Sequence, residues 1–247
     1  MAAEDLLGIV VVTSKEKAIR DLAEIVAQAA FKTQKSRLVL VKPNVCGMYP
    51  PSIGLLESVI KYLKPSSQAI VIGETPSGMH TPSERFASLG IDKIAKRHEV
   101  TTLDLMNDKI VNKIIPKPHA MEVIRFPSTV FQADLLVNCP GLGTHGNTLL
   151  TCALKNLFGL VAERHKYTSL HMRGVSEVIA DIYQVVKPQL NVVDSGEKVL
   201  VGTDALSIDL LASEIKGLSP NKVKHLALAA EDRSLDIRSL EVKSVEV

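Results

Sequence analysis

The segment from residue 137 to residue 159, VNCPGLGTHGNTLLTCALKNLFG, concentrates side chains that could bind a ligand or do chemistry. It contains a G-x-G-x-x-G pattern at Gly141, Gly143 and Gly146, which follows an apolar run and precedes a predicted helix at 147–162. That arrangement is typical of a dinucleotide-binding turn, in which glycines let the backbone approach a pyrophosphate group. The first hypothesis to test is therefore a nicotinamide or flavin cofactor.

Dinucleotide binding needs two further features that this chain lacks. A second strand should follow the helix, and an acidic residue ~20 residues after the glycines should bind the ribose. The nearest acidic residue, Glu163, precedes the polar stretch RHKYTSLHMRG, and the next predicted strand begins only at residue 189. We therefore predict that neither NAD nor FAD binds at residues 141–146.

The predicted helix at 147–162 carries a lysine in mostly apolar surroundings. Thr148, Thr151 and Lys155 stand at i, i+3 and i+7 and would form one polar stripe, opposite a leucine-rich face. Such a stripe is most often a solvated face of an amphipathic helix. The apolar sequence around Lys155 instead favours a buried ammonium, which requires an anionic partner. We expect Lys155 to face inward and to reach back toward His145 as an anion ligand.

Two histidines flank this helix and could meet in space. Imidazole titrates near neutral pH, so His145 and His171 are candidates for general acid and base catalysis. A hydrogen-bonded structural histidine is the commoner alternative for each. No histidine pair has the spacing of a helical metal site.

Polar residues also stand at the ends of the predicted strands. In open α/β sheets, binding sites form outside the carboxyl ends of parallel strands, so these residues should converge on one sheet edge. Separate structural roles, such as a helix cap at Asp204 or a turn at Asn44, are the alternative. The residues are Lys42, Asn44, Glu74, Asn138, Asp194 and Asp204.

Short, continuously apolar, β-branched runs alternate with helical periodicity along the chain. This pattern predicts an α/β fold with a mainly parallel sheet, helices on both faces, and a small antiparallel excursion around 99–126. We expect a single domain over 1–247. Strands are predicted at 8–13, 37–42, 68–74, 99–105, 121–126, 133–139, 189–194, 198–204 and 240–247. Helices are predicted at 15–31, 53–63, 147–162, 173–187, 205–215 and 220–231.

Composition argues against several classes of function. The formal net charge of +2 gives no field that would favour nucleic acid. No apolar stretch approaches the ~18 residues needed to span a bilayer, so no membrane association is expected. The cysteines Cys46, Cys139 and Cys152 form no C-x-x-C, which argues against an iron–sulfur cluster. The chain is expected to be soluble and cytoplasmic, and its oligomeric state, including a homo-oligomer, is left open.

Over nearly its whole length the chain resembles the domain of unknown function 362 family. The matching stretches include LVLVKPNVCG (38–47), IGETPSG (72–78), the segment 133–161 and the segment 181–215. The family occurs in archaea and bacteria, and its members are sometimes fused to ferredoxin-type cluster modules. The resemblance suggests an archaeal-type protein and implies no established reaction. It implies that Lys42, Asn44, His145, Thr148, Lys155, Asn156, Gly159, His171, Asp194, Asp204 and Asp209 occupy family-characteristic positions. The family usually reads Pro-Lys-x-Lys-Thr-His where this chain has PGLGTH, so Gly141 and Gly143 replace two lysines.

Two functions follow from these observations. The first is an enzyme that acts on a small anionic metabolite, a carboxylate or a phosphate, by acid/base chemistry such as a racemase- or isomerase-type proton transfer. His145, His171 and Lys155 would be catalytic, and Asp194, Asp204 and Asp209 would be oxygen ligands in a Mg²⁺-assisted variant. The alternative is a non-catalytic protein that binds a small molecule, cofactor or anion. The expected ligand-binding residues are Lys42, Asn44, Glu74, Gly143, Thr144, Thr148 and Asn156.

Overall fold

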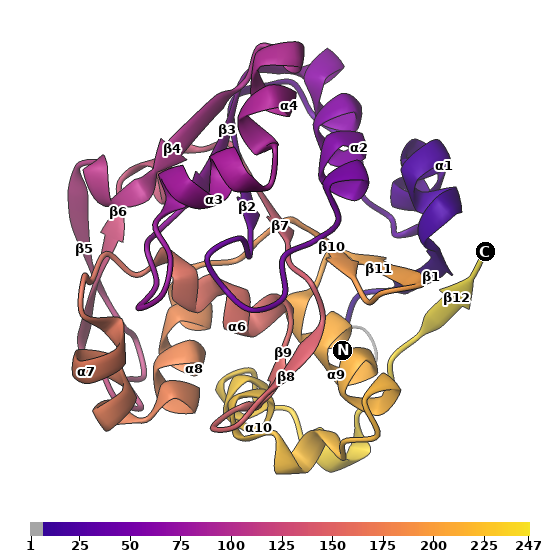
Figure 1. Ribbon diagram of the computed structural model, residues 1–247. Helices are drawn as coiled ribbons and strands as arrows, with labels where there is room; N and C mark the ends of the chain where they lie inside the picture. Colours follow the sequence, from indigo (N-terminus) through magenta and orange to yellow (C-terminus); the bar gives the residue numbers. More distant parts are fainter. Residues whose placement is uncertain (1–6) are drawn as a thin grey trace.

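The computed structural model describes residues 7–247, which surround a central eight-stranded sheet (Figure 1). The strand order across this sheet is β12-β1-β11-β10-β7-β2-β3-β4. The strands are β1 (Val10–Ser14), β2 (Ser36–Pro43), β3 (Ser67–Glu74), β4 (Thr101–Asp104), β7 (Leu135–Cys139), β10 (Leu190–Asp194), β11 (Lys198–Gly202) and β12 (Ser244–Glu246). All neighbouring strands are parallel except for the two pairings made by β11. The mainly parallel α/β sheet expected from the sequence is confirmed.

Helices cover both faces of the sheet, and each face has its own hydrophobic core. One core includes buried residues of α1 (Lys15–Gln28), α2 (Ile53–Leu63), α3 (Pro82–Ser88) and α4 (Ile91–His98). The other core includes α6 (Ala153–Leu157), α8 (Val175–Val185), α9 (Ala205–Ile215) and α10 (Lys224–Asp232). Figure 1 shows the two groups of helices on either side of the sheet. No helix among residues 7–247 combines the length and the apolar character that a membrane crossing requires.

The antiparallel excursion occupies part of the predicted segment. Strands β5 (Ile110–Ile114) and β6 (Val123–Pro127) form a separate two-stranded antiparallel sheet, which leads into the short helix α5 (Thr129–Gln132). Strand β4 pairs instead with β3, as a parallel edge strand of the main sheet. Helices α3 and α4 were not predicted, although Thr81, Pro82 and Glu84 form a capping box with proline in the first turn.

Strand direction decides which strand-end residues can meet. Strands β2, β3, β7 and β10 run in the same direction, so Lys42, Glu74, Asn138 and Asp194 lie at one edge of the sheet. Strand β11 runs the opposite way, which puts Asp204 at the other edge. There its side chain caps α9 by accepting hydrogen bonds from the backbone of Leu206 and Ser207. The expectation that all six strand-end residues cluster is therefore wrong for Asp204.

The predicted helix at 147–162 is wrong over residues 147–152 and correct in its middle part, where α6 lies. Residues 143–151 form an antiparallel hairpin of β8 (Gly143–His145) and β9 (Leu149–Thr151), and α6 begins only at Ala153. The turn contains Gly146 and Asn147, a pair that favours tight hairpin turns over helix. Thr148, Thr151 and Lys155 consequently do not form one helical stripe.

Candidate functional site

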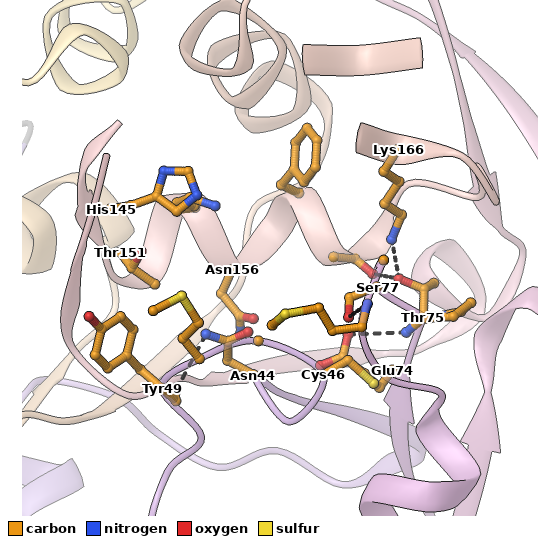
Figure 2. Close-up of a pocket in the computed structure, with 18 of the residues that line it drawn as sticks. Asn44, Cys46, Tyr49, Glu74, Thr75, Ser77, His145, Thr151, Asn156 and Lys166 are labelled. Carbon is orange, nitrogen blue, oxygen red and sulfur yellow. Dashed lines mark hydrogen bonds between the residues drawn. The ribbon is translucent and has the colours of Figure 1, made fainter. Parts of the chain in front are cut away.

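A cavity of about 600 Å³ opens at the carboxyl edge of the parallel strands. Two loops form one side of it, residues 44–49 after β2 and residues 74–79 after β3. The opposite side consists of the β8–β9 hairpin, α6 and the short 3₁₀ helix η4 (Phe158–Leu160). Lys166 and His171, from the segment that follows η4, complete the wall. Figure 2 shows these side chains pointing toward one space between the two sides.

The structure brings His145, His171 and Lys155 to this same cavity, although the helix that carries Lys155 begins only at Ala153. Burial, together with the nearby charges of Lys155 and His171, lowers the pKa of His145 to about 4. Burial and the Lys155 charge also lower the pKa of His171. Both rings are therefore neutral near pH 7. His145 Nδ1 accepts a hydrogen bond from the Asn147 backbone at 3.2 Å, so the proton of the neutral ring sits on Nε2.

Lys155 is a partly buried cation that has no acidic partner among the residues that the structure describes. Its ammonium lies 5.8 Å from the centroid of the Phe158 ring, and no carboxylate of residues 7–247 forms an ion pair with it. Burial lowers its pKa to about 8. Burial lowers the pKa of His225, a fully buried residue of α10, and the Lys155 charge acts in the same direction. Within the described chain, neither ring nitrogen of His225 has a hydrogen-bond partner. Among residues 7–247, no carboxylate therefore forms an ion pair with the cation at this end of the cavity.

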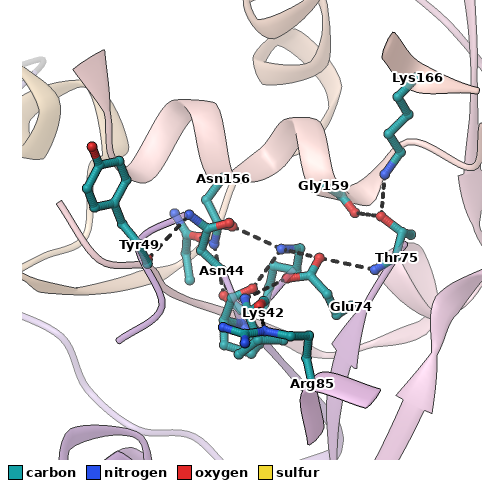
Figure 3. Close-up of polar contacts among 12 residues, drawn as sticks. Lys42, Asn44, Tyr49, Glu74, Thr75, Arg85, Asn156, Gly159 and Lys166 are labelled. Carbon is teal, nitrogen blue, oxygen red and sulfur yellow. Dashed lines mark hydrogen bonds and ion pairs between the residues drawn. The ribbon is translucent and has the colours of Figure 1, made fainter. Parts of the chain in front are cut away.

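The second cation of the cavity, Lys166, is not predicted by any pattern in the sequence. Its ammonium donates a hydrogen bond to the Thr75 hydroxyl, which in turn donates to the Gly159 carbonyl (Figure 3). Burial lowers the Lys166 pKa to about 8, although the neighbouring Glu74 charge opposes that shift. Lys166 lies in a polar stretch without helical or strand periodicity, so no pattern distinguished it from a surface lysine.

Lys42 was expected to bind the ligand, but it lies below the cavity as part of the scaffold. Its side chain is fully buried, and its ammonium pairs with Glu74 Oε1 at 2.7 Å. The remaining hydrogen bonds go to the Pro43 carbonyl at 2.7 Å and to Asn156 Oδ1 at 2.9 Å (Figure 3). A lysine ammonium has three donors, and all three are occupied. Lys42 is therefore a structural residue, and the expectation that it binds the ligand is wrong.

A row of buried amides continues from Lys42 across the sheet. Asn156 Nδ2 donates to Asn138 Oδ1 at 2.7 Å, and Asn138 Nδ2 donates to Asn191 Oδ1 at 2.9 Å. Asn191 Nδ2 completes the row by donating to the Gly202 carbonyl at 3.3 Å. We call the set Glu74, Lys42, Asn156, Asn138 and Asn191 the polar ladder. It ties α6 to four strands and so fixes the floor of the cavity.

Three other expected ligand residues also lie at the cavity. Asn44, Glu74 and Asn156 all line it. Asn44 Nδ2 donates to the Tyr49 carbonyl at 3.4 Å, which helps to hold the loop after β2. Cys46 lines the same wall, and burial raises the pKa of its thiol to about 12, which keeps it protonated.

The remaining hairpin residues lie elsewhere. Thr144 lines an adjoining hollow of about 690 Å³, which shares His145 and His171 with the main cavity. Thr148 lines neither space, and its hydroxyl donates to the Leu150 carbonyl at 3.1 Å. Gly143 packs against Tyr49, so that a Cβ at this position would lie 2.3 Å from the ring. Gly143 and Thr148 are thus structural.

The three aspartates proposed to bind Mg²⁺ do not meet. Asp194 pairs with Lys15 at 2.8 Å, whereas Asp204 pairs with Arg233 at 2.7 Å at the opposite sheet edge. Asp209 is buried in α9, and its carboxylate accepts hydrogen bonds from the backbone of Ala153 and Leu154 at the start of α6. Within residues 7–247 no group of three or more histidine, cysteine, aspartate or glutamate side chains could hold a metal ion. The shared metal site expected from the sequence is therefore not formed by these aspartates.

The comparisons with known proteins find one matching family model and similar solved structures. A family model described as a domain of unknown function, DUF362, matches residues 39–214. A protein from Thermotoga maritima shares 15% identity at a TM-score of 0.50, over 87% of this chain and 59% of its own. The lactate racemase apoprotein from Thermoanaerobacterium thermosaccharolyticum shares 16% identity at a TM-score of 0.47, over 83% of this chain and 56% of its own. The chain thus spans less than two thirds of the length of either protein, and no curated protein matches it.

Proposed function

This chain belongs to the DUF362 family, whose description assigns no reaction, and we propose from its own geometry that it is an enzyme acting on a small anionic metabolite. The anion is a carboxylate or a phosphate, and the reaction is a proton transfer. The observation that carries the proposal is the meeting of His145, His171 and Lys155 in one cavity.

The charge of the cavity supports an anionic ligand. Lys155 and Lys166 both line it, and neither forms an ion pair with a described carboxylate. Glu74 is the acidic residue of the lining, and its charge is compensated by Lys42 at 2.7 Å. A partly buried ammonium without an acidic partner is costly, and a bound anion would remove that cost.

Two neutral imidazoles beside one cation suit proton transfer. A neutral histidine can accept a proton from an acidic C–H, and Lys155 would stabilise the negative charge that develops on the substrate. A bound anion would offset the Lys155 charge, which is one cause of the low pKa values of His145 and His171. Ligand binding would therefore raise both pKa values toward neutrality, where general acid and base catalysis is most effective.

A non-catalytic anion-binding protein is the second candidate. It is favoured by the low pKa of His145, about 4, which makes this ring a weak base before a ligand binds. The two candidates differ in one respect. An enzyme needs the histidine rings for its chemistry, whereas a binding protein needs only the cations.

The test is hydrogen exchange in D₂O. The protein is incubated with a panel of 2-hydroxy, 2-amino and 2-methyl carboxylic acids and their phosphorylated forms, and deuterium uptake at carbon is followed by mass spectrometry. We expect uptake into one class of acid, and loss of that uptake in His145→Gln and in His171→Gln. His165→Gln is the matched control, because His165 is exposed and lies outside the cavity lining.

The outcomes separate the two candidates. Binding of these acids without exchange, with affinity unchanged in both cavity histidine variants, would contradict the enzyme and support the binding protein. Exchange that persists in both variants would contradict the roles of His145 and His171.

A further inference from the structure

The two cations of the cavity occupy separate positions. His145 and Lys166 lie at opposite ends of the space in Figure 2, with Asn156 between them. The charge of Lys155 acts on His145 and His171, at one end. The groups that act on Lys166 are instead Glu74, Lys42, Cys46 and Asp104. The cavity therefore has two cationic ends rather than one cationic cluster.

At neither end does a carboxylate of the described residues form an ion pair with the cavity lysine, although the charges of Glu74 and Asp104 act on Lys166. Among residues 7–247, the ammonium of Lys155 forms no hydrogen bond or ion pair, and that of Lys166 hydrogen-bonds the Thr75 hydroxyl. Glu74 lies near Lys166, but its carboxylate oxygens already accept from Lys42, from the Val45 backbone and from the Thr75 backbone. Each end thus presents a positive charge that an acidic group of a ligand could meet.

The space between the ends is large and has apolar walls. A volume of about 600 Å³ would hold roughly 20 waters at ~30 Å³ each, far more than one small acid displaces. Met48, Met79, Pro76 and Phe158 line it together with the ring of Tyr49. Such walls suit a hydrocarbon segment rather than a sugar or another polyhydroxylated chain.

We propose that the natural ligand is a dianion, with one acidic group at Lys155 and a second at Lys166, joined by a mainly apolar spacer. The proposal rests on the proposed function, because the Lys155 end is the site of the acid/base chemistry. It adds a second anion site, at which Lys166, held in place by its hydrogen bond to the Thr75 hydroxyl, binds the end of the substrate that does not react. The group at Lys166 is a carboxylate or a phosphate, since both accept hydrogen bonds from an ammonium.

The test is a calorimetric titration with matched probes at pH 7. One series is the α,ω-dicarboxylates from succinate to suberate, and the second is the monocarboxylates of the same carbon numbers. A third, of ω-phosphonocarboxylates, distinguishes a phosphate-like group from a carboxylate at the Lys166 end. The proteins are the wild type, Lys155→Met, Lys166→Met and the control Lys93→Met, since Lys93 is an exposed lysine of α4.

We expect the best dicarboxylate or phosphonocarboxylate to bind wild type about tenfold more tightly than its matched monocarboxylate, or better. The reason is that the second acidic group adds a charged hydrogen bond, which contributes ~1.4 kcal/mol or more. Lys166→Met should remove this advantage and leave monocarboxylate affinity unchanged. Lys155→Met should weaken both kinds of probe. If Lys166→Met folds poorly, Lys166→Gln, which keeps a polar end group but has no charge, serves as the second variant in which the dianion advantage is measured.

The results separate this inference from the function on which it rests. Equal affinity of wild type for matched monoanions and dianions would overturn the dianion proposal. The single-anion site would still stand if Lys155→Met abolished binding of both kinds of probe. A dianion preference that survives both Lys166 variants would also overturn it. Failure of every probe to bind wild type would overturn the proposed function and this inference together.

Discussion

At the scale of single residues, the cavity depends on lysines whose roles their sequence contexts do not reveal. Lys42 is fully buried with all three ammonium donors occupied, so it serves the fold. Lys155 and Lys166 line the cavity and have no acidic partner among the described residues, so they can serve a ligand. The two roles differ in exposure and in ammonium partners, since Lys42 is fully buried with every donor occupied and the two cavity lysines are only partly buried.

Lys155→Met should separate stability from binding. The change keeps the aliphatic stem and removes a partly buried charge that no carboxylate compensates, so the ligand-free protein should be equally stable or more stable by up to about 1 kcal/mol. Anion affinity should fall at least on the order of tenfold, because a charge-assisted hydrogen bond is lost. Urea unfolding and calorimetric titration measure the two effects. Marked destabilisation together with unchanged affinity would show that Lys155 is structural.

At the scale of elements, the β8–β9 hairpin and the loop after β2 shape the cavity together. Gly141 donates its backbone N–H to the Tyr49 carbonyl at 3.1 Å, and a Cβ on Gly141 would lie 2.5 Å from that oxygen. A Cβ on Gly143 would lie 2.3 Å from the Tyr49 ring. The glycines that resemble a dinucleotide motif are therefore explained by close packing of two loops. The lysines usual in the family at these positions would require Tyr49 to move.

Gly143→Ala tests this packing. The added methyl group would meet the Tyr49 ring, and overpacking of this kind costs about 1–3 kcal/mol of unfolding free energy. Gly146→Ala is the control, because nothing lies within 4 Å of a Cβ there, and its effect should stay within about 0.5 kcal/mol. Gly143→Ala should cost much less in a Tyr49→Ala background. Equal effects in both backgrounds would mean that Tyr49 is not the obstacle.

The polar ladder gives a second prediction at this scale. Lys42→Met leaves the buried Glu74 carboxylate without its cation, and breaking a buried ion pair costs about 3–5 kcal/mol. The double variant Lys42→Met/Glu74→Gln removes the stranded charge as well and should recover part of that loss. Chemical denaturation of wild type, both single variants and the double variant measures the coupling. Purely additive effects would contradict a direct pairing of the two residues.

At the scale of the whole molecule, the sequence predicts the sheet better than the site. Apolar β-branched runs such as 37–42 and 189–194 are continuous because both faces of the sheet are covered, and they become β2 and β10. Strand β11 runs antiparallel to β10 because a short turn joins the two strands, and the apolar pattern of a strand does not predict its direction. That reversal separates Asp204 from Asp194.

The sequence predicts part of the site, and the residues and elements that it does not predict have physical explanations. His145, His171, Lys155, Asn44, Glu74 and Asn156 do line one cavity. The helical stripe failed because the turn at Gly146 and Asn147 outweighs a leucine-rich pattern that also fits strand β9. Lys166 and Thr75 meet across 91 positions of sequence, a contact that only the tertiary fold creates.

The central claim, that Lys155 is the cation of an anion site, is tested most directly by its titration. Protein labelled with ¹³Cε-lysine is followed by NMR from pH 6 to pH 11, and the Lys155 signal is assigned by its absence in Lys155→Met. Without ligand we expect a midpoint near the pKa of about 8 that burial produces. Saturating succinate should raise the midpoint, because an anion favours the charged form. Anion affinity must then fall as the pH rises above 8, where the free protein has lost the proton that binding requires. A midpoint near the ordinary lysine value of 10.5, unchanged by the anion, would contradict the claim.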